Sequence, residues 1–164
     1  MNKNNANNTR LMRICHTLAT LGPIGYLPAP GTITTVLTAA VLFLLAQFGV
    51  PALSIRHALL PLIILGTIVI HYAVQQFNKH DPSEIVLDEV LGYTFASSLF
   101  PHTLLWLCAT VIIFRFFDII KPLGIKKLEQ ISGATGILLD DLLAAVYTQI
   151  FLILLCMGYD TWFR

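Results

Sequence analysis

The chain has 164 residues, of which 56% are hydrophobic and only 12% are charged, and its mean hydropathy is +0.76. A soluble domain carries about 25% charged residues, so this composition argues against a soluble protein and predicts a membrane protein. The net charge of +1 gives no electrostatic reason to expect a nucleic acid or an acidic protein as a partner. The three cysteines show no C-x-x-C spacing, which indicates apolar packing residues rather than a metal site.

The chain begins with a polar segment that is rich in asparagine, residues 1–13. This segment has little apolar surface to bury, so we expect a disordered leader followed by a single helical domain over residues 14–164. It lacks the continuous apolar region of a secretory signal peptide. The mildly apolar residues 14–21 predict a helix that lies against the bundle or at the membrane interface.

A turn-rich loop follows over residues 22–35 and ends at Pro30, Gly31 and Thr32, immediately before an apolar run. This pattern predicts a helix that begins near Pro30. The first N–H groups of a helix have no partner within the helix, so Gly31 and Thr32 are candidates to bind an anion. On the motif alone an ordinary helix cap is the favoured interpretation, because Thr is a common N-cap residue. No G-x-x-x-x-G-K-[ST] motif is present, which argues against a nucleotide-binding P-loop.

Four long uncharged runs occupy most of the remaining chain. They cover residues 33–50, 58–74, 91–114 and 142–159, and each is near the length of about 20 residues that a spanning helix needs. The third run is different because it contains Pro101 and His102. A turn at this point would divide it into arms of about ten and twelve residues, too short for two crossings. The sequence therefore predicts an all-α, multi-helix, membrane-associated bundle with a short or re-entrant helical hairpin.

The distribution of basic residues supports this hairpin. Cytoplasmic segments of membrane proteins carry an excess of Lys and Arg. With a cytoplasmic N-terminus, the hairpin leaves eight basic residues inside and two outside. Those inside are Lys3, Arg10, Arg13, Lys79, Arg115, Lys121, Lys126 and Lys127, and those outside are Arg56 and Arg164. A single crossing would instead carry the three lysines after residue 120 to the outside.

An acidic segment precedes the third run. Asp81, Glu84 and Asp88 are three and four residues apart, so they share a helical face if a helix begins at Asp81–Pro82. Glu89 is the next residue. Clustered carboxylates repel one another, and a divalent cation relieves this repulsion. A solvated acidic face at the bilayer surface is the alternative interpretation.

The stretch from residue 114 to 147 is where the rest of the chemistry is expected. Arg115, Asp118 and Lys121 are three residues apart and predict a shared helical face, and Asp140 and Asp141 begin an apolar segment. Charged groups among Leu, Ile and Phe are costly unless they pair, bind a metal or meet a ligand. We therefore predict a Mg²⁺ and phosphate site at a membrane surface.

Four motifs in order, GYLPAPGT, IVLDEVLG, FRFFDIIKP and GILLDD, resemble the motifs of the bacterial phosphatidylglycerophosphatase A family. The resemblance implies an all-helical, Mg²⁺-dependent phosphatase of the inner membrane. Such an enzyme removes the terminal phosphate from phosphatidylglycerophosphate, a step of phospholipid biosynthesis, and here its site would face the cytoplasm. The chain departs from the family pattern at Thr34–Thr35, where relatives tend to have Gly-Ser.

The resemblance also assigns roles to residues. The implied metal ligands are Asp81, Asp88, Glu89, Asp140 and Asp141, the implied substrate-binding residues are Gly31, Thr32, Arg115 and Lys121, and the implied catalytic residues are Asp88, Asp118, Lys121 and Asp141. The nucleophile is either a water molecule that a carboxylate orients or an aspartate.

The alternative function is a non-catalytic or transport-type membrane protein with a carboxylate ion site. Transport is disfavoured because the acids lie at the ends of the apolar runs rather than in their middle. A scaffold would leave the clustered carboxylates without a partner. The oligomeric state does not follow from the sequence.

Overall fold

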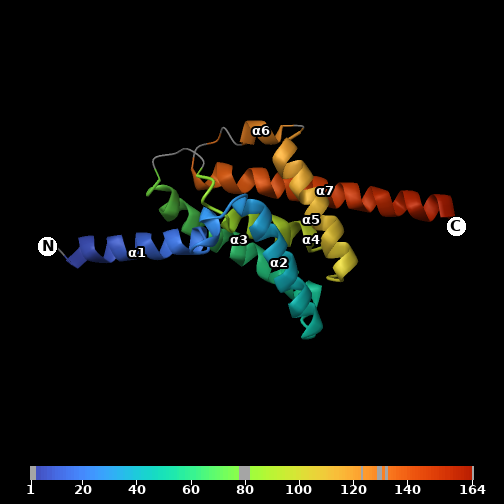
Figure 1. Ribbon diagram of the computed structural model, residues 1–164, viewed down its shortest axis with the longest axis horizontal. Helices are drawn as coiled ribbons and strands as arrows, with labels where there is room; N and C mark the ends of the chain where they lie inside the picture. The colour runs from blue at the N-terminus through green and yellow to red at the C-terminus, as the bar shows by residue number, and fades with distance from the viewer. Residues whose placement is uncertain (1–2, 78–81, 123, 129–130, 132, 164) are drawn as a thin grey trace.

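The computed structural model describes residues 3–77, 82–122, 124–128, 131 and 133–163. These residues form helices and connecting loops, without a strand, which confirms the all-α prediction (Figure 1). The elements are α1 (Lys3–Ala19), the short 3₁₀ helix η1 (Ile24–Tyr26), α2 (Pro30–Gln47), α3 (Ala52–Val74), α4 (Leu87–Ser97), α5 (Leu104–Ile120), α6 (Ile125–Leu128) and α7 (Ala134–Phe163).

Three helices are long and apolar enough to cross a membrane: α2 over Pro30–Gln47, α3 over Ala52–Val74 and α7 over Ala134–Gly158. Their outer faces expose large apolar side chains, among them Val36, Leu37, Val41, Leu44, Leu60, Ile64, Leu65, Ile68, Leu154 and Leu155. A continuous apolar surface of this kind is unfavourable in water and matches lipid tails. The bundle is therefore membrane-associated, as predicted.

Helices α4 and α5 form the predicted short hairpin. Asp88 at the start of α4 is ten residues from Ser98, and Leu104 at the start of α5 is eleven residues from Arg115. At about 1.5 Å per residue, the segments from the turn to Asp88 and to Arg115 measure roughly 15 and 17 Å, about half of a hydrocarbon core of roughly 30 Å. Residues 99–103, with Pro101 and His102, connect the arms. Helix α5 is longer than the expected twelve residues because it continues beyond Phe114 through the charged stretch.

The end of α4 receives hydrogen bonds from two other helices. The side chain of Gln149 on α7 donates from Nε2 to the carbonyl oxygen of Phe95 at 2.7 Å. Arg56 on α3 donates from Nε and Nη2 to the carbonyl oxygen of Ser98 at 3.1 and 2.8 Å. The last carbonyls of a helix have no partner within it, and in a membrane they must find one in the protein. These two side chains allow the hairpin to turn inside an apolar bundle.

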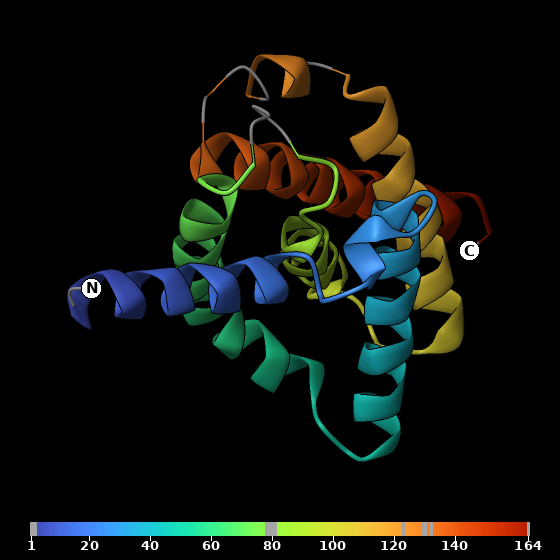
Figure 2. The ribbon, with the colours of Figure 1, turned by 60° about the vertical axis from the view of Figure 1, so that its left-hand side comes forward.

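Helix α4 lies at the centre of the bundle, between α2, α3, α5 and α7 (Figure 2). Its contact with α7 is close because residue 92 is glycine: a Cβ there would lie 2.9 Å from Cβ of Asp141 and 3.1 Å from Cζ of Phe114. The fully buried ring of Tyr93 packs edge-on against Phe114, with ring centroids 6.0 Å apart. Its hydroxyl donates to the carbonyl oxygen of Leu107 at 3.0 Å.

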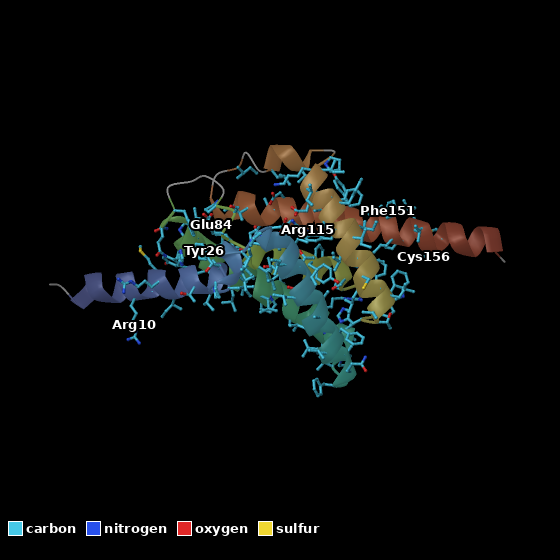
Figure 3. The ribbon with its side chains drawn as sticks, viewed as in Figure 1. Arg10, Tyr26, Glu84, Arg115, Phe151 and Cys156 are labelled. Carbon is cyan, nitrogen blue, oxygen red and sulfur yellow. The ribbon has the colours of Figure 1, made fainter. Side chains whose placement is uncertain are left out.

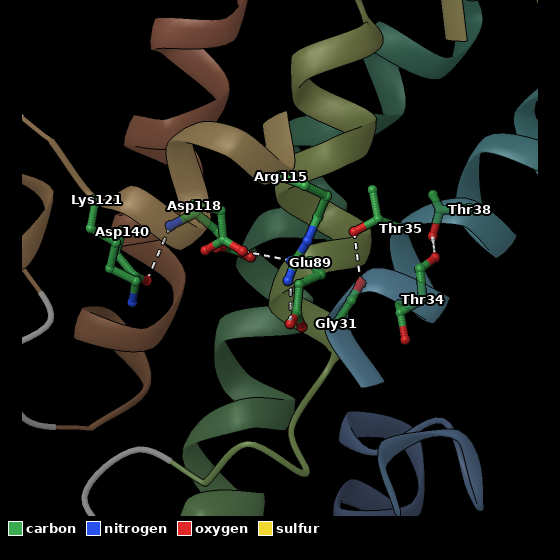
Figure 4. Close-up of polar contacts among 10 residues, drawn as sticks. Gly31, Thr34, Thr35, Thr38, Glu89, Arg115, Asp118, Lys121 and Asp140 are labelled. Atoms are coloured by element: carbon green, nitrogen blue, oxygen red, sulfur yellow. Dashed lines mark hydrogen bonds and ion pairs between the residues drawn. The ribbon is translucent and has the colours of Figure 1, made fainter. Parts of the chain in front are cut away.

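The direction of each helix brings the predicted polar residues to one end of the bundle. Helices α2, α4 and α7 begin there, and α5 ends there, so Gly31, Glu89, Arg115 and Asp140 lie close together (Figure 4). The hairpin brings Arg115 to this end because α5 runs back toward the start of α4. A single crossing would have placed the residues that follow it at the opposite end.

The structure differs from two local expectations. A disordered leader was expected over residues 1–13, but α1 begins at Lys3. Its later part packs on α3, where Gln76 donates to the carbonyl oxygen of Met12 at 2.5 Å, and extending an existing helix is easier than starting one. A helix was also expected from Asp81–Pro82. Asp81 lies outside the described residues, and α4 begins only at Leu87 because the Val86 amide donates to the carbonyl oxygen of Ala19 at 2.9 Å.

We predict that Gln149→Leu destabilises the bundle. The substitution keeps an apolar stem and removes one donor to the Phe95 carbonyl, which still accepts hydrogen bonds from the amide and the hydroxyl of Ser98. The expected cost is therefore that of one hydrogen bond, about 0.5–1.5 kcal/mol. Gln75→Leu is the matched control, because Gln75 is exposed and its side chain shares a hydrogen bond with the exposed His71. The midpoint of thermal unfolding in detergent measures the effect. Equal midpoints for the two variants would contradict the role of Gln149.

Candidate functional site

A polar cavity of about 290 Å³ lies at the end of the bundle where these helices meet. Figure 3 shows Arg115 inside the bundle, whereas Arg10 points away from α1 into the surroundings. The cavity is lined by Ala29, Pro30, Gly31, Pro82, Ser83, Ile85, Asp88, Glu89, Arg115, Asp118, Ile119, Lys121, Ile137, Asp140 and Asp141. Five of these residues are acids and two are bases, so the cavity has an excess of formal negative charge.

Three of the acids form a compact cluster. Asp88 and Glu89 come from the first turn of α4, and Asp141 comes from the second turn of α7. Each offers a carboxylate oxygen, and these oxygens all lie within 4.8 Å of one another. Asp88 is only 9% exposed and Asp141 only 3%. The absent side chain of Gly92 allows this proximity, because a Cβ there would meet Asp141.

Burial makes this cluster electrostatically costly. Within the described part of the chain, Oδ1 of Asp88, Oε2 of Glu89 and Oδ2 of Asp141 are buried and have no hydrogen-bond partner. Burial, and after it the charge of Glu89, raises the pKa of Asp88 well above its ordinary value. Burial also raises the pKa of Glu89 to about 7. Groups of this kind are stabilised as anions by a cation placed between them.

Arg115 connects the acid cluster with the end of α5. Its Nη1 atom lies 2.5 Å from Oδ2 of Asp118, one helical turn later, and 3.9 Å from Oε1 of Glu89 (Figure 4). The pair between Arg115 and Asp118 confirms that these residues share a helical face. Because Asp118 holds the guanidinium group, Arg115 keeps a fixed orientation toward Glu89 and the cavity.

Lys121 is held by a different helix. It follows the last residue of α5 with a positive φ of 48°, so it does not continue the helical face of Arg115 and Asp118. Its Nζ atom instead lies 2.7 Å from Oδ2 of Asp140 on α7. The other carboxylate oxygen of Asp140 accepts a hydrogen bond from the Asp141 amide at 3.1 Å. Lys121 thereby joins the end of α5 to the start of α7.

The start of α2 closes the opposite side of the cavity. Ala29 adopts a left-handed conformation with φ 52°, and Pro30 occupies the first turn of the helix. A Cβ on Gly31 would overlap Oε1 of Glu89 and lie 3.1 Å from Nη1 of Arg115. Glycine therefore allows the backbone of α2 to approach the charged groups without displacing the Glu89 carboxylate. Thr32 does not line the cavity, and its amide donates to the carbonyl oxygen of Ala29 at 3.1 Å.

Most of the predicted site residues meet in this cavity. Gly31, Asp88, Glu89, Arg115, Asp118, Lys121, Asp140 and Asp141 all line it, whereas Thr32 does not. Of the five predicted metal ligands, three form the compact cluster, Asp140 pairs with Lys121, and Asp81 lies outside the described residues.

Sequence reasoning missed two contributors to the site. Ser83 lines the cavity from the turn before α4, and the Pro82–Ser83 pair in an acidic segment was a turn signal that pointed to it. Gly92 does not line the cavity but sets the distance between α4 and α7. Its signal was an isolated glycine inside an apolar helical run, which often marks a close packing contact.

The chemistry available to this cavity follows from its charges. Clustered carboxylates provide the oxygen ligands that a hard divalent cation prefers. Arg115 and Lys121 provide donors for the oxygens of a phosphate group. The excess of acids would repel a phosphate on its own, so an anion can enter favourably only when a cation occupies the cluster.

The sequence profile described as phosphatidylglycerophosphatase A matches residues 17–156 of the chain. A Haemophilus influenzae protein named phosphatidylglycerophosphatase A is 35% identical over 126 residues, which cover 75% of this chain and 76% of that protein. An Escherichia coli protein of the same name is 31% identical over 86 residues, which cover 51% of this chain and 50% of that protein.

A Bacteroides thetaiotaomicron protein, provisionally named a phosphatidylinositol-3-phosphatase, is 33% identical over 133 residues, which cover 77% of this chain and 83% of that protein. No solved structure matches the chain significantly. The profile runs from the end of α1 into the second half of α7, and the motifs that carried the resemblance supply the cavity. The chain therefore belongs to the phosphatidylglycerophosphatase A family.

Proposed function

We propose that the chain hydrolyses phosphatidylglycerophosphate to phosphatidylglycerol and phosphate, with Mg²⁺ as its cofactor, in phospholipid biosynthesis. Membership of the family makes the chain a phosphatase of the phosphoric monoester class. The observation that carries the specific proposal is the cavity, in which a cluster of three carboxylates, two buried and one partly buried, lies beside an arginine and a lysine at the end of an apolar bundle. Such a position suits a lipid whose phosphate lies at the membrane surface.

The residues of the cluster fit a divalent cation. Their buried oxygens on Asp88, Glu89 and Asp141 have no hydrogen-bond partner among the described residues, which is costly unless a ligand is bound. Three carboxylates on two helices match the oxygen donors that Mg²⁺ prefers. Mg²⁺ held there would supply positive charge that offsets the charge of the phosphate oxygens.

The other charged residues would position the phosphate. Arg115 presents a planar fork of donors, oriented by Asp118, and Lys121 presents a point charge oriented by Asp140. Hydrolysis breaks the bond between phosphorus and the terminal glycerol oxygen, which takes up a proton, while an oxygen from water joins the phosphate. A carboxylate such as Asp88 or Asp141 either orients that water or attacks phosphorus first.

The arrangement favours this function over the alternatives. A transport-type ion site would lie near the middle of the spanning helices, whereas this cluster lies at their ends. A non-catalytic protein would have no use for buried carboxylates without partners. A second phosphatase substrate, phosphatidylinositol 3-phosphate, is favoured only by the name of the Bacteroides relative, so both lipids belong in the assay.

The decisive experiment measures phosphate release by the purified protein from each of the two lipids. We expect release from phosphatidylglycerophosphate that requires Mg²⁺ and stops on addition of EDTA, while the helical circular dichroism signal is kept. The fold should survive because apolar packing, rather than the metal, holds the helices together. Activity that EDTA leaves unchanged would show that the metal proposal is wrong, and a preference for the inositol lipid would overturn the proposed substrate.

Substitutions can separate the metal role from the phosphate role. Asp141→Asn should lower activity about 10- to 100-fold, with partial recovery at high Mg²⁺, because a cluster ligand is lost. Lys121→Met should lower activity by about 2–4 kcal/mol of transition-state stabilisation without recovery at high Mg²⁺. Arg115→Lys should be intermediate because it keeps the charge and loses the planar fork.

Arg10→Met is the matched control, since Arg10 is an exposed base outside the cavity. Each variant is checked for a single peak in size-exclusion chromatography before its kinetics are measured. A rate for Lys121→Met within about twofold of the unmodified protein would remove Lys121 from the site and leave its contact with Asp140 as a helix-end pair.

We further propose that the protein is a multi-pass protein of the bacterial inner membrane with its cavity facing the cytoplasm. The excess of basic residues at the cavity end supports this orientation. In a variant without native cysteines, a cysteine at the exposed Thr135 should react only from the cytoplasmic side, and one at the exposed Ser54 only from the other side. A membrane-impermeant maleimide applied to spheroplasts and to inverted vesicles distinguishes them. Labelling of both positions from one side would contradict the hairpin topology.

A further inference from the structure

A second hollow lies on the lipid-facing surface, between α2 and α5. It has a volume of about 510 Å³, which is within the range of small-molecule sites. Its walls include Val36, Ala40 and Leu44 from α2 and Leu104, Cys108 and Ile112 from α5. All ten of its lining residues are apolar. The short side chains of Ala40 and Cys108, both exposed, leave the space between the larger ones. We call this hollow the α2–α5 groove.

The α2–α5 groove is aligned with the polar cavity. Helices α2 and α5 lie side by side in opposite directions (Figures 1 and 2). Val36 follows Gly31 by five residues and Ile112 precedes Arg115 by three, so the groove begins about 5–8 Å along the helices from the cavity. It then extends over nine residues of each helix, from Val36 to Leu44 and from Ile112 to Leu104, or about 12 Å.

This length corresponds to a lipid chain. One leaflet contributes about half of a hydrocarbon core of roughly 30 Å. A chain whose head group lies in the cavity would cross the first 5–8 Å and then fill the groove, reaching about 20 Å from the site. The two hollows thus match the two parts of one molecule, with charged groups where the phosphate would lie and apolar walls where the hydrocarbon would lie.

We propose that the α2–α5 groove binds one acyl chain of the phospholipid whose phosphate occupies the polar cavity. The inference rests on the proposed function, since it takes a lipid phosphomonoester as the substrate. Bilayer hydrocarbon is as apolar as the groove, so transfer of the chain into the groove yields little hydrophobic free energy. The groove acts by orientation: a chain held between α2 and α5 directs the head group toward Arg115 and the acid cluster.

Filling the groove tests this role. Ala40→Phe places a ring in the hollow from an exposed position, without a change in the buried core. The ratio of kcat/KM for dipalmitoyl to dihexanoyl phosphatidylglycerophosphate should fall about tenfold, because only the long chain extends along the whole groove and loses its orientation when the groove is filled. Ala58→Phe is the matched control: Ala58 is exposed on α3, away from the groove, and its ratio should equal that of the unmodified protein. An unchanged ratio in Ala40→Phe would overturn the proposal.

A second measurement is independent of turnover. Phosphatidylglycerophosphate with a photoreactive diazirine in the middle of one acyl chain should crosslink to residues 36–44 and 104–112, and Ala40→Phe should abolish these crosslinks. Crosslinks spread evenly over the exposed faces of α2, α3 and α7 would overturn the groove proposal even if phosphate release is normal. Specific crosslinks without phosphate release would instead support the groove and contradict the proposed reaction.

Discussion

The close contact between α4 and α7 at Gly92 is the constraint on which the site depends. Asp141 can lie beside Asp88 and Glu89 only because residue 92 has no side chain to separate the two helices. The three carboxylates then lose much of their contact with water, and part of their hydrogen-bonding capacity has no partner in the described structure. Packing of the apolar core thus holds together carboxylates that would otherwise move apart. A cation between them would stabilise their charged forms.

The short hairpin gives this cluster its neighbours. Because α4 and α5 turn back after about half the thickness of a bilayer, Arg115, Asp118 and Lys121 return to the end of the bundle from which α4 started. Such a turn inside an apolar environment needs partners for the last carbonyls of α4, and Arg56 and Gln149 donate to them. Arg56 and Gln149 thus stabilise the turn of the hairpin, and the turn places Arg115, Asp118 and Lys121 at the cavity.

The charged pairs around the cluster orient the bases rather than neutralise them. Asp118 holds Arg115 toward Glu89, and Asp140 holds Lys121 from another helix. Gly31 at the start of α2 brings the backbone against Glu89 and Arg115, which closes the cavity. From there α2 and α5 continue together as the two walls of the apolar groove. A polar cavity and an apolar groove that follow one another along the same two helices suit a phospholipid better than a soluble phosphate ester.

The sequence by itself determined the class of fold, the hairpin and most of the charged residues that line the cavity. The long uncharged runs, Pro101 with its flanking arms and the charges of Arg115, Asp118 and Asp141 follow from composition and spacing, because lipid demands apolar helices and makes misplaced charges costly. Only the tertiary structure decided which carboxylates cluster and which pair. Spacing within a helix did not reveal that Lys121 turns away from Asp118 to reach Asp140, that α4 begins at Leu87, or that the N-terminal segment from Lys3 is helical. Each of these depends on a contact with another helix or loop, and the energy of such contacts is not encoded in local spacing.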